Sequence, residues 1–231
     1  MIRLVYTFSK KISGRYLNEY LDLLERSYIH NSKYHSIVLY TDTVTYPIVK
    51  NIIDDIVIIE DIDVIFMDDL KMNIIGELKP TDILADFDIF LTSPVRLPEV
   101  FDVCIDIKEH LNTNFDYKRI LNYFAKLGLN LYRKDINYLS NVGFLKINNK
   151  YLLKSIQENY FKVRNWYLSN HIENTTVQTK FEPSVIALQY QLEVICKDKL
   201  YTVSELRKSN KYFHLTGADK FKTLELTNQV I

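Results

Sequence analysis

Short apolar segments separated by segments of helical periodicity dominate the first part of this 231-residue chain. Residues 1–7, 36–42 and 55–60 are rich in Ile, Val, Leu and Tyr and have the length of single strands. Helices are expected at residues 16–29, around residues 49–52 and at residues 69–77. Strands that alternate with helices form parallel sheets of βαβ units, in which ligands bind beyond the carboxyl ends of the strands. The sequence therefore predicts an α/β fold with a mostly parallel central sheet flanked by helices.

Two acids, Asp86 and Asp88, interrupt the next apolar segment, between residues 83–85 and residues 89–91. We expect one strand through residues 81–91, on which alternation places both acids on the same side. Two close carboxylates destabilise each other unless a cation lies between them, and carboxylate oxygens suit magnesium and manganese. The pattern thus predicts a metal–diphosphate site at the end of a central strand. The alternative is an edge strand that carries two solvated acids, because D-x-D is a short pattern.

The composition is that of a globular protein, with 47% hydrophobic and 25% charged residues. Lys and Arg together number 29, as do Asp and Glu, so a nucleic-acid binder with a broad basic face is not expected. Cys104 and Cys196 lie in apolar surroundings and are expected to be buried, reduced thiols. The sequence shows neither a secretory leader nor an apolar run long enough for a transmembrane segment, so we expect a soluble, cytoplasmic protein.

The second half of the chain continues the mixed pattern without an internal repeat or a clear linker, which favours a single domain over residues 1–231. Strands are expected at residues 101–107, 142–147, 200–203 and 211–215. Helices are expected at residues 115–129, 151–166 and 183–195, with a loop at residues 168–180.

The last predicted strand leads into a second motif, in which His214, Gly217 and Lys220 are spaced three residues apart. Imidazole is a good ligand for a borderline metal, glycine lets the backbone approach an anion, and lysine brings a compact positive charge to phosphate. Taken alone, His214 is better explained as a structural histidine. Together with the upstream D-x-D motif, it belongs to a recognisable set.

With these two motifs the chain resembles the nucleotide-sugar glycosyltransferases of the GT-A (Rossmann-like) fold, and among them family 8, which includes glycogenin and bacterial lipopolysaccharide galactosyltransferases. The resemblance implies that Asp86, Asp88 and His214 bind manganese (or magnesium), which holds the donor diphosphate. Gly217 and Lys220 would contact that diphosphate. It also implies a nucleotide-binding half over residues 1–100 and an acceptor half over residues 101–231.

Further residues are assigned by the same resemblance. Lys71, with Lys79 as a weaker substitute, stands where the family has a lysine that contacts the donor. Asn141 and Gly143 match an N-x-G motif near the donor sugar, although a plain turn would explain them equally well. The end of the first strand, with Tyr6, Thr7 and also Tyr16, would hold the base and ribose. Asp42 is either a ribose contact or a helix cap. Glu182 stands where the family has Asp-Gln and joins Lys71, Asp86 and Asp88 as a catalytic candidate.

The resemblance implies a metal-dependent hexosyltransferase that moves a sugar from a UDP-sugar to a hydroxyl of a glycan, lipid-linked or protein acceptor, with retention of configuration. A homodimer is left open. Two alternatives remain. One is a protein of the same fold that binds nucleotide or glycan without turnover. The other is a D-x-D phosphatase of the haloacid-dehalogenase type, in which the motif normally ends the first strand.

Overall fold

The computed structural model describes residues 2–98, 100–110, 125, 127–128, 138–171, 185–196, 200–203 and 212–215. Within these residues the elements alternate as predicted in the first hundred positions. The strands are β1 (Arg3–Phe8), β2 (Ser36–Asp42), β3 (Ile56–Ile59), β4 (Asp82–Ala85), β5 (Ile89–Leu91), β6 (Val103–Ile105), β7 (Ile107–His110), β8 (Tyr138–Asn141), β9 (Phe144–Ile147), β10 (Leu200–Thr202) and β11 (Tyr212–His214). The helices are α1 (Lys10–Ser13), the 3-10 turn η1 (Gly14–Tyr16), α2 (Leu17–Asn31), α3 (Tyr46–Val49), α4 (Asp69–Ile74), α6 (Lys150–His171), the π-helix η3 (Val185–Tyr190) and α8 (Gln191–Cys196).

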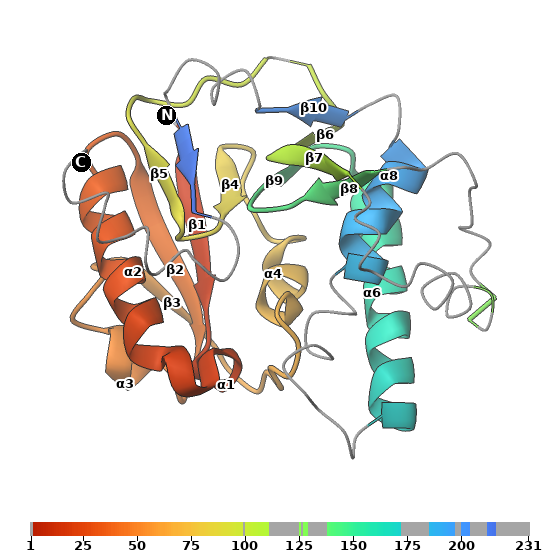
Figure 1. Cartoon of the computed structure of the whole chain (residues 1–231), viewed down its shortest axis with the longest axis horizontal. Helices are drawn as coiled ribbons and strands as arrows, with labels where there is room; N and C mark the ends of the chain where they lie inside the picture. Colours follow the sequence, from red (N-terminus) through yellow and green to blue (C-terminus); the bar gives the residue numbers. More distant parts are fainter. Residues whose placement is uncertain are drawn as a thin grey trace.

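A seven-stranded sheet forms the centre of the molecule, in the order β10-β6-β9-β4-β1-β2-β3 (Figure 1). The strands β4, β1, β2 and β3 run parallel to one another, and β10 runs parallel to β6. Strand β9 is antiparallel to both of its neighbours, β4 and β6. The predicted α/β class with a mostly parallel central sheet is confirmed, and β4 with its two acids lies in the interior of the sheet.

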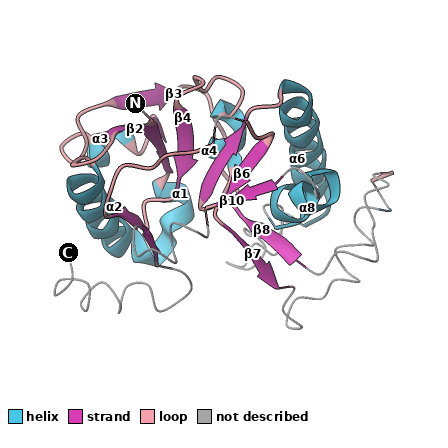
Figure 2. Ribbon diagram, turned by 90° about the horizontal axis from the view of Figure 1, so that it is seen from above, coloured by secondary structure: helices cyan, strands magenta, loops and turns pink. Residues whose placement is uncertain are grey.

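Both faces of the sheet are covered, which explains why its strands are apolar on both sides. Alternate residues of β1 belong to different core clusters: Val5 packs with side chains of α6 and α8, whereas Leu4 and Tyr6 pack with Leu24 of α2. Figure 2 shows α2 and α3 at one side of the molecule and α6 and α8 at the other. The described helices are too short or too polar to cross a membrane.

The segment through residues 81–91 is not one strand, which corrects the sequence prediction. Strand β4 ends at Ala85, and the chain turns at Asp86–Asp88 before β5 begins. Strand β5 leaves the central sheet and pairs with β11 in a separate two-stranded sheet. A pair of carboxylates inside a buried ladder would be costly to desolvate, so the turn places them at the strand end. The two-solvated-acids alternative fails as well, because Asp88 is buried and β4 is not an edge strand.

Other differences are local. The predicted strand at residues 101–107 divides at Asp106 into β6 and β7, which belong to different sheets. Helix α6 continues to His171, beyond its predicted end and into the expected loop. The expected late helix is present as η3 and α8, and β11 matches the last expected strand. The predicted helix at residues 115–129 falls almost wholly outside the described residues.

Candidate metal and nucleotide site

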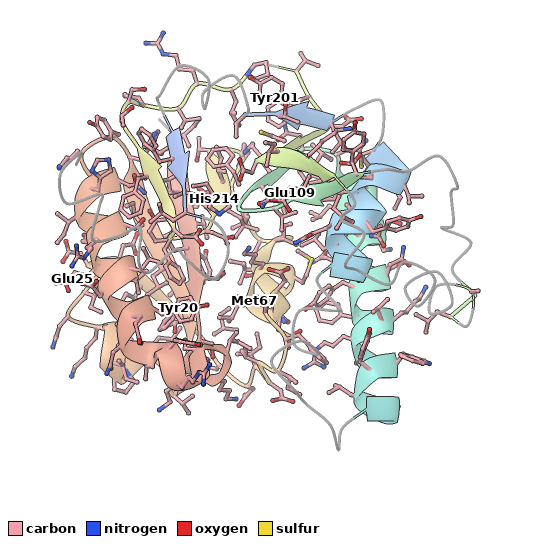
Figure 3. All side chains as sticks on the ribbon, viewed as in Figure 1. Tyr20, Glu25, Met67, Glu109, Tyr201 and His214 are labelled. Atoms are coloured by element: carbon pink, nitrogen blue, oxygen red, sulfur yellow. The ribbon has the colours of Figure 1, made fainter. Side chains whose placement is uncertain are left out.

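A cavity of about 420 Å³ opens beyond the carboxyl ends of β1 and β4. This is the edge of a parallel sheet at which ligands are expected to bind. The labelled side chains of Tyr20, Met67, Glu109 and His214 in Figure 3 come from α2, the loop before α4, β7 and β11, and all four line it. The cavity is also lined by the D-x-D acids and by Lys71, Asn141 and Gly143. The cavity is large enough for a small-molecule ligand.

Asp86, Asp88 and His214 converge on this cavity, with one potential ligand atom from each lying within 4.8 Å of the others. Strand pairing brings them together, because β11 places His214 opposite Ile89, the residue after Asp88. The backbone N–H of Leu215 donates to the carbonyl of Asp88 at 2.9 Å and extends this pairing. His214 Nε2 lies 3.1 Å from Asp88 Oδ1. The sequence prediction that these three residues share one site agrees with this geometry.

Asp106 orients the imidazole of His214 from the other side. Its side chain is fully buried, and Oδ2 lies 2.5 Å from His214 Nδ1. Burial lowers the pKa of His214, but the hydrogen bonds to Asp106 and Asp88 outweigh it and raise the pKa to about 10. In the neutral ring, a proton on Nδ1 would be donated to Asp106 and Nε2 would be left as the ligand atom. Metal-binding histidines commonly show this arrangement of a carboxylate behind the ring.

Gly143 makes room for His214. A Cβ built on Gly143 would lie 2.5 Å from His214 Cε1 and 3.1 Å from Asn141 Oδ1. Its backbone N–H also donates to Asn141 Oδ1 at 2.8 Å, and its carbonyl accepts from the N–H of Asp86. The glycine of the N-x-G motif is thus needed for a close approach of the histidine ring.

Lys71 lies between two carboxylates at the cavity wall. Its Nζ is 2.6 Å from Asp86 Oδ1 and 3.2 Å from Asp68 Oδ1. Burial lowers the pKa of Lys71, yet the attraction of Asp68 and Asp86 outweighs burial and the pKa is raised. Lys71 therefore holds a fixed positive charge beside the D-x-D motif. Lys71 is therefore not a solvated helix residue, and its side chain is only 8% exposed.

The loop that carries Val64, Met67 and Asp68 into the cavity wall is anchored through Asp69. Asp69 Oδ2 accepts from the backbone N–H groups of residues 65 and 66, at 2.8 and 2.9 Å. Its Oδ1 accepts from Tyr160 Oη at 2.9 Å and from Arg164 Nε at 3.0 Å. Helix α6 thereby holds one wall of the cavity in place.

The other predicted site residues divide into three groups. Thr7 and Asn141 line the cavity. Tyr6 is a correction: its side chain is fully buried, and its hydroxyl lies 2.9 Å from Ser27 Oγ and 2.7 Å from Asn31 Nδ2, so it does not reach the cavity. Three predicted residues lie outside the described residues, namely Glu182, Gly217 and Lys220.

Two further expectations at strand and helix ends are settled by contacts. Asp42 Oδ1 accepts from the backbone N–H of Thr45 at 2.9 Å and from its hydroxyl at 2.8 Å, so it closes the turn before α3, whose N-cap residue is Thr45, and it does not line the cavity. Tyr16 is 40% exposed, does not line the cavity, and accepts a hydrogen bond from Arg15 at 2.7 Å.

Four residues of the site were not singled out from the sequence: Asp68, Asp106, Glu109 and Gln189 all line the cavity or contact its histidine. The contact of Asp68 with Lys71 could have been expected, because the two residues are three apart, the spacing at which helical side chains meet. Asp106 is the penultimate residue of a predicted strand, and site residues often lie at strand ends. Glu109 accepts a hydrogen bond from Asn141 Nδ2 at 2.7 Å, which depends on strand pairing and is not visible in the sequence.

Comparison with known proteins gives a distant likeness in fold. Neither a protein-family profile nor a curated protein sequence matches this chain. Among solved structures, the glycosyltransferase GlyE of Streptococcus pneumoniae TIGR4 matches with 12% identity and a TM-score of 0.48, over 95% of this chain and 55% of that one. Its apo form matches with 12% identity and a TM-score of 0.46, over 94% and 55%. The chain thus spans about half the length of these structures.

Proposed function

We propose that this protein is a metal-dependent glycosyltransferase, which moves a sugar from a nucleotide-diphosphate sugar, of the UDP type, to an acceptor hydroxyl. The observation that carries the proposal is the convergence of Asp86, Asp88 and His214 beside Lys71 in one cavity at the carboxyl edge of the sheet. Retention of configuration, the UDP carrier and the acceptor classes rest on the sequence resemblance alone. A cytoplasmic location and a homodimer remain predictions.

The donor set suits manganese or magnesium. Two carboxylates and an imidazole supply oxygen and nitrogen ligands, and Asp106 behind the imidazole provides the orienting carboxylate found at many metal sites. Asp86, Asp88 and His214 would hold the ion. When bound, such an ion neutralises the charge that grows on the departing diphosphate.

The chain's own groups supply the rest of the proposed mechanism. Lys71 keeps its charge in the cavity wall and would attract a donor phosphate, while Asp68 and Asp86 hold its ammonium in place. Thr7, at the end of β1, would contact the nucleoside part of the donor, and Asn141 the sugar. The apolar wall formed by Phe8, Met67 and others would limit the access of water to the reacting carbon.

The phosphatase alternative is disfavoured by the position of the motif and by the ion pair of Asp86. In that class the first Asp attacks phosphorus at the end of the first strand, whereas Asp86 follows β4 and lies 2.6 Å from Lys71. A binding protein without turnover has the same static geometry as an enzyme. Turnover therefore has to be measured.

The experiment is nucleotide release from a panel of UDP-, GDP- and TDP-sugars, with manganese or with chelator. The proteins compared are the wild type, Asp88→Ala and, as a matched control, Asp22→Ala, whose side chain is 50% exposed on α2. Release from one donor that needs both manganese and Asp88 but not Asp22 would support the proposal. Metal-dependent nucleotide binding without release would favour the binding protein. Neither release nor metal-dependent binding on any donor would overturn the proposal.

A further inference from the structure

A second cavity, of about 430 Å³, lies at the opposite end of the central strands and is called the rear cavity here. Strand β4 runs from Asp82, which lines the rear cavity, to the D-x-D turn, and β9 runs from the Gly143 side back to Lys146. The segment after α4, with Gly76 and Leu78, and the start of α6 complete its lining. The rear cavity therefore lies at the other end of β4 and β9 from the first cavity and shares none of its lining residues.

Four lysines line the rear cavity: Lys79, Lys146, Lys150 and Lys154. The acid among its described lining residues is Asp82, and that charge is already compensated. Arg3 donates to both of its oxygens, at 2.9 and 2.7 Å, and the backbone N–H of Lys79 donates to Oδ2 at 2.9 Å. The rear cavity thus carries a large local excess of positive charge in a chain whose formal net charge is zero.

Two backbone acceptors at the rear cavity are already engaged. Lys146 Nζ donates to the carbonyls of Pro80 and Asp82, so these oxygens are not left to receive a ligand's proton. An ammonium has three N–H groups, so Lys146 can still donate to a ligand. The 22-residue helix α6 begins at Lys150, and the positive end of its dipole adds to the field of the lysines. The rear cavity thus offers several charged donors to a ligand.

We propose that the rear cavity binds a small phosphate-bearing anion, with Lys79, Lys146 and Lys150 as the charged donors. A compact ammonium is a good partner for phosphate, and three or four of them in one cavity suit a ligand with two phosphate groups better than a monovalent ion. Lys154 is a weaker contributor, because its side chain is 78% exposed and lies 3.9 Å from Glu158. This assignment does not depend on the glycosyltransferase proposal.

The probe is sodium pyrophosphate, titrated into chelator-treated ¹⁵N-labelled full-length protein and followed by amide chemical shifts. Gly76 and Asn148 report on the rear cavity, and Thr7 and Gly143 report on the first one. Saturable shifts at Gly76 and Asn148 are expected. Shifts confined to Thr7 and Gly143, or no saturable shift at all, would overturn the proposal.

The paired variant is Lys79→Gln/Lys150→Gln, which removes two exposed ammonium groups with little risk to folding. Each lost charge-assisted hydrogen bond is worth about tenfold in affinity, so the dissociation constant at the rear cavity should rise about 10- to 100-fold. The control is Lys33→Gln/Lys50→Gln, two exposed lysines that line neither cavity. An equal loss of pyrophosphate affinity in both double variants would indicate general charge attraction and would contradict a specific site.

A phosphate group could be carried by a soluble molecule or by a lipid. Co-sedimentation with phosphatidylcholine vesicles, with and without phosphatidic acid, separates the two sources. Binding to acidic vesicles that pyrophosphate displaces, and that Lys79→Gln/Lys150→Gln weakens, would assign the site to a lipid headgroup. Pyrophosphate binding without vesicle binding would assign it to a soluble ligand.

Discussion

Gly143→Ala should impair the proposed metal site through His214, without removing any ligand. The new Cβ would lie 2.5 Å from His214 Cε1, whereas carbon atoms in contact are about 3.5–4.0 Å apart. The ring must therefore move by about 1 Å. The contacts of the imidazole nitrogens with Asp106, at 2.5 Å, and with Asp88, at 3.1 Å, cannot both survive such a shift. We expect manganese affinity to fall about 10- to 100-fold, as for lost orienting contacts, and stability to fall by about 1–3 kcal/mol from overpacking.

The assay is calorimetric titration with manganese, beside thermal unfolding without metal. Gly76→Ala is the control, because its Cβ would meet nothing closer than Gln157 Oε1 at 3.4 Å, so its manganese affinity should stay unchanged. A double-mutant cycle with His214→Ala tests whether Gly143→Ala lowers manganese affinity through the histidine ring. If Gly143→Ala acts through the ring, it should weaken manganese binding little further once the ring is gone. Wild-type affinity in a folded Gly143→Ala protein, or full additivity with His214→Ala, would refute the reasoning.

The remaining predictions concern supporting groups. Asp106→Asn should keep the fold but lower manganese affinity about tenfold in the same titration. Asp69→Asn removes a fully buried charge paired with an arginine, so urea denaturation should show a loss of about 3–5 kcal/mol, and an unchanged midpoint would contradict it. Burial raises the pKa of Asp82, but the hydrogen bond from Arg3 outweighs burial, so the pKa is lowered. The ionised Asp82 therefore stabilises the fold above the pKa that it has in the unfolded chain, and this stabilisation is lost as the pH falls below about 4. Asp82→Asn should cost about 2 kcal/mol near neutral pH, and its difference from wild type should shrink in acid unfolding curves. Burial raises the pKa of Cys104 to about 12, and Cys196 is also a buried thiol, so iodoacetamide should alkylate neither thiol until the protein unfolds, as mass spectrometry would show.

The sheet could be predicted from the sequence because its signals are local. Apolar segments of strand length and the helical spacing between them specify βαβ units, and these appear as β1 to β4 in the structure. Burial of the two thiols followed from their apolar neighbours in the same way. The break after Ala85 was missed because the apolar run continues on both sides of the acids. A period-2 pattern does not show that one strand ends and another, in a different sheet, begins.

The residues that converge on the cavity could be predicted from the sequence, but their supporting contacts could not. Carboxylates two residues apart at the end of an apolar run indicate a cation site by chemistry alone. Asp106 and Asp69 are as important to the geometry, yet each acts on a partner far away in the sequence, His214 and Arg164. Tyr6 failed as a prediction for a related reason. Tyr6 points into the core beside α2, whereas Thr7 and Phe8 at the end of β1 line the cavity.

The meeting of the D-x-D motif with His214 depends on the register of two antiparallel pairs. Strand β9 pairs Phe144 with Ala85, and the carbonyl of Gly143 accepts from the Asp86 N–H, which fixes where the turn starts. Strand β11 pairs with β5, which fixes His214 after the turn. A slip of one residue in either pair would send the side chains to the opposite face. The convergence of Asp86, Asp88 and His214 is therefore a consequence of pairing on both sides of a three-residue turn, so variants that weaken β5–β11 pairing should reduce manganese affinity with all three side chains still in place.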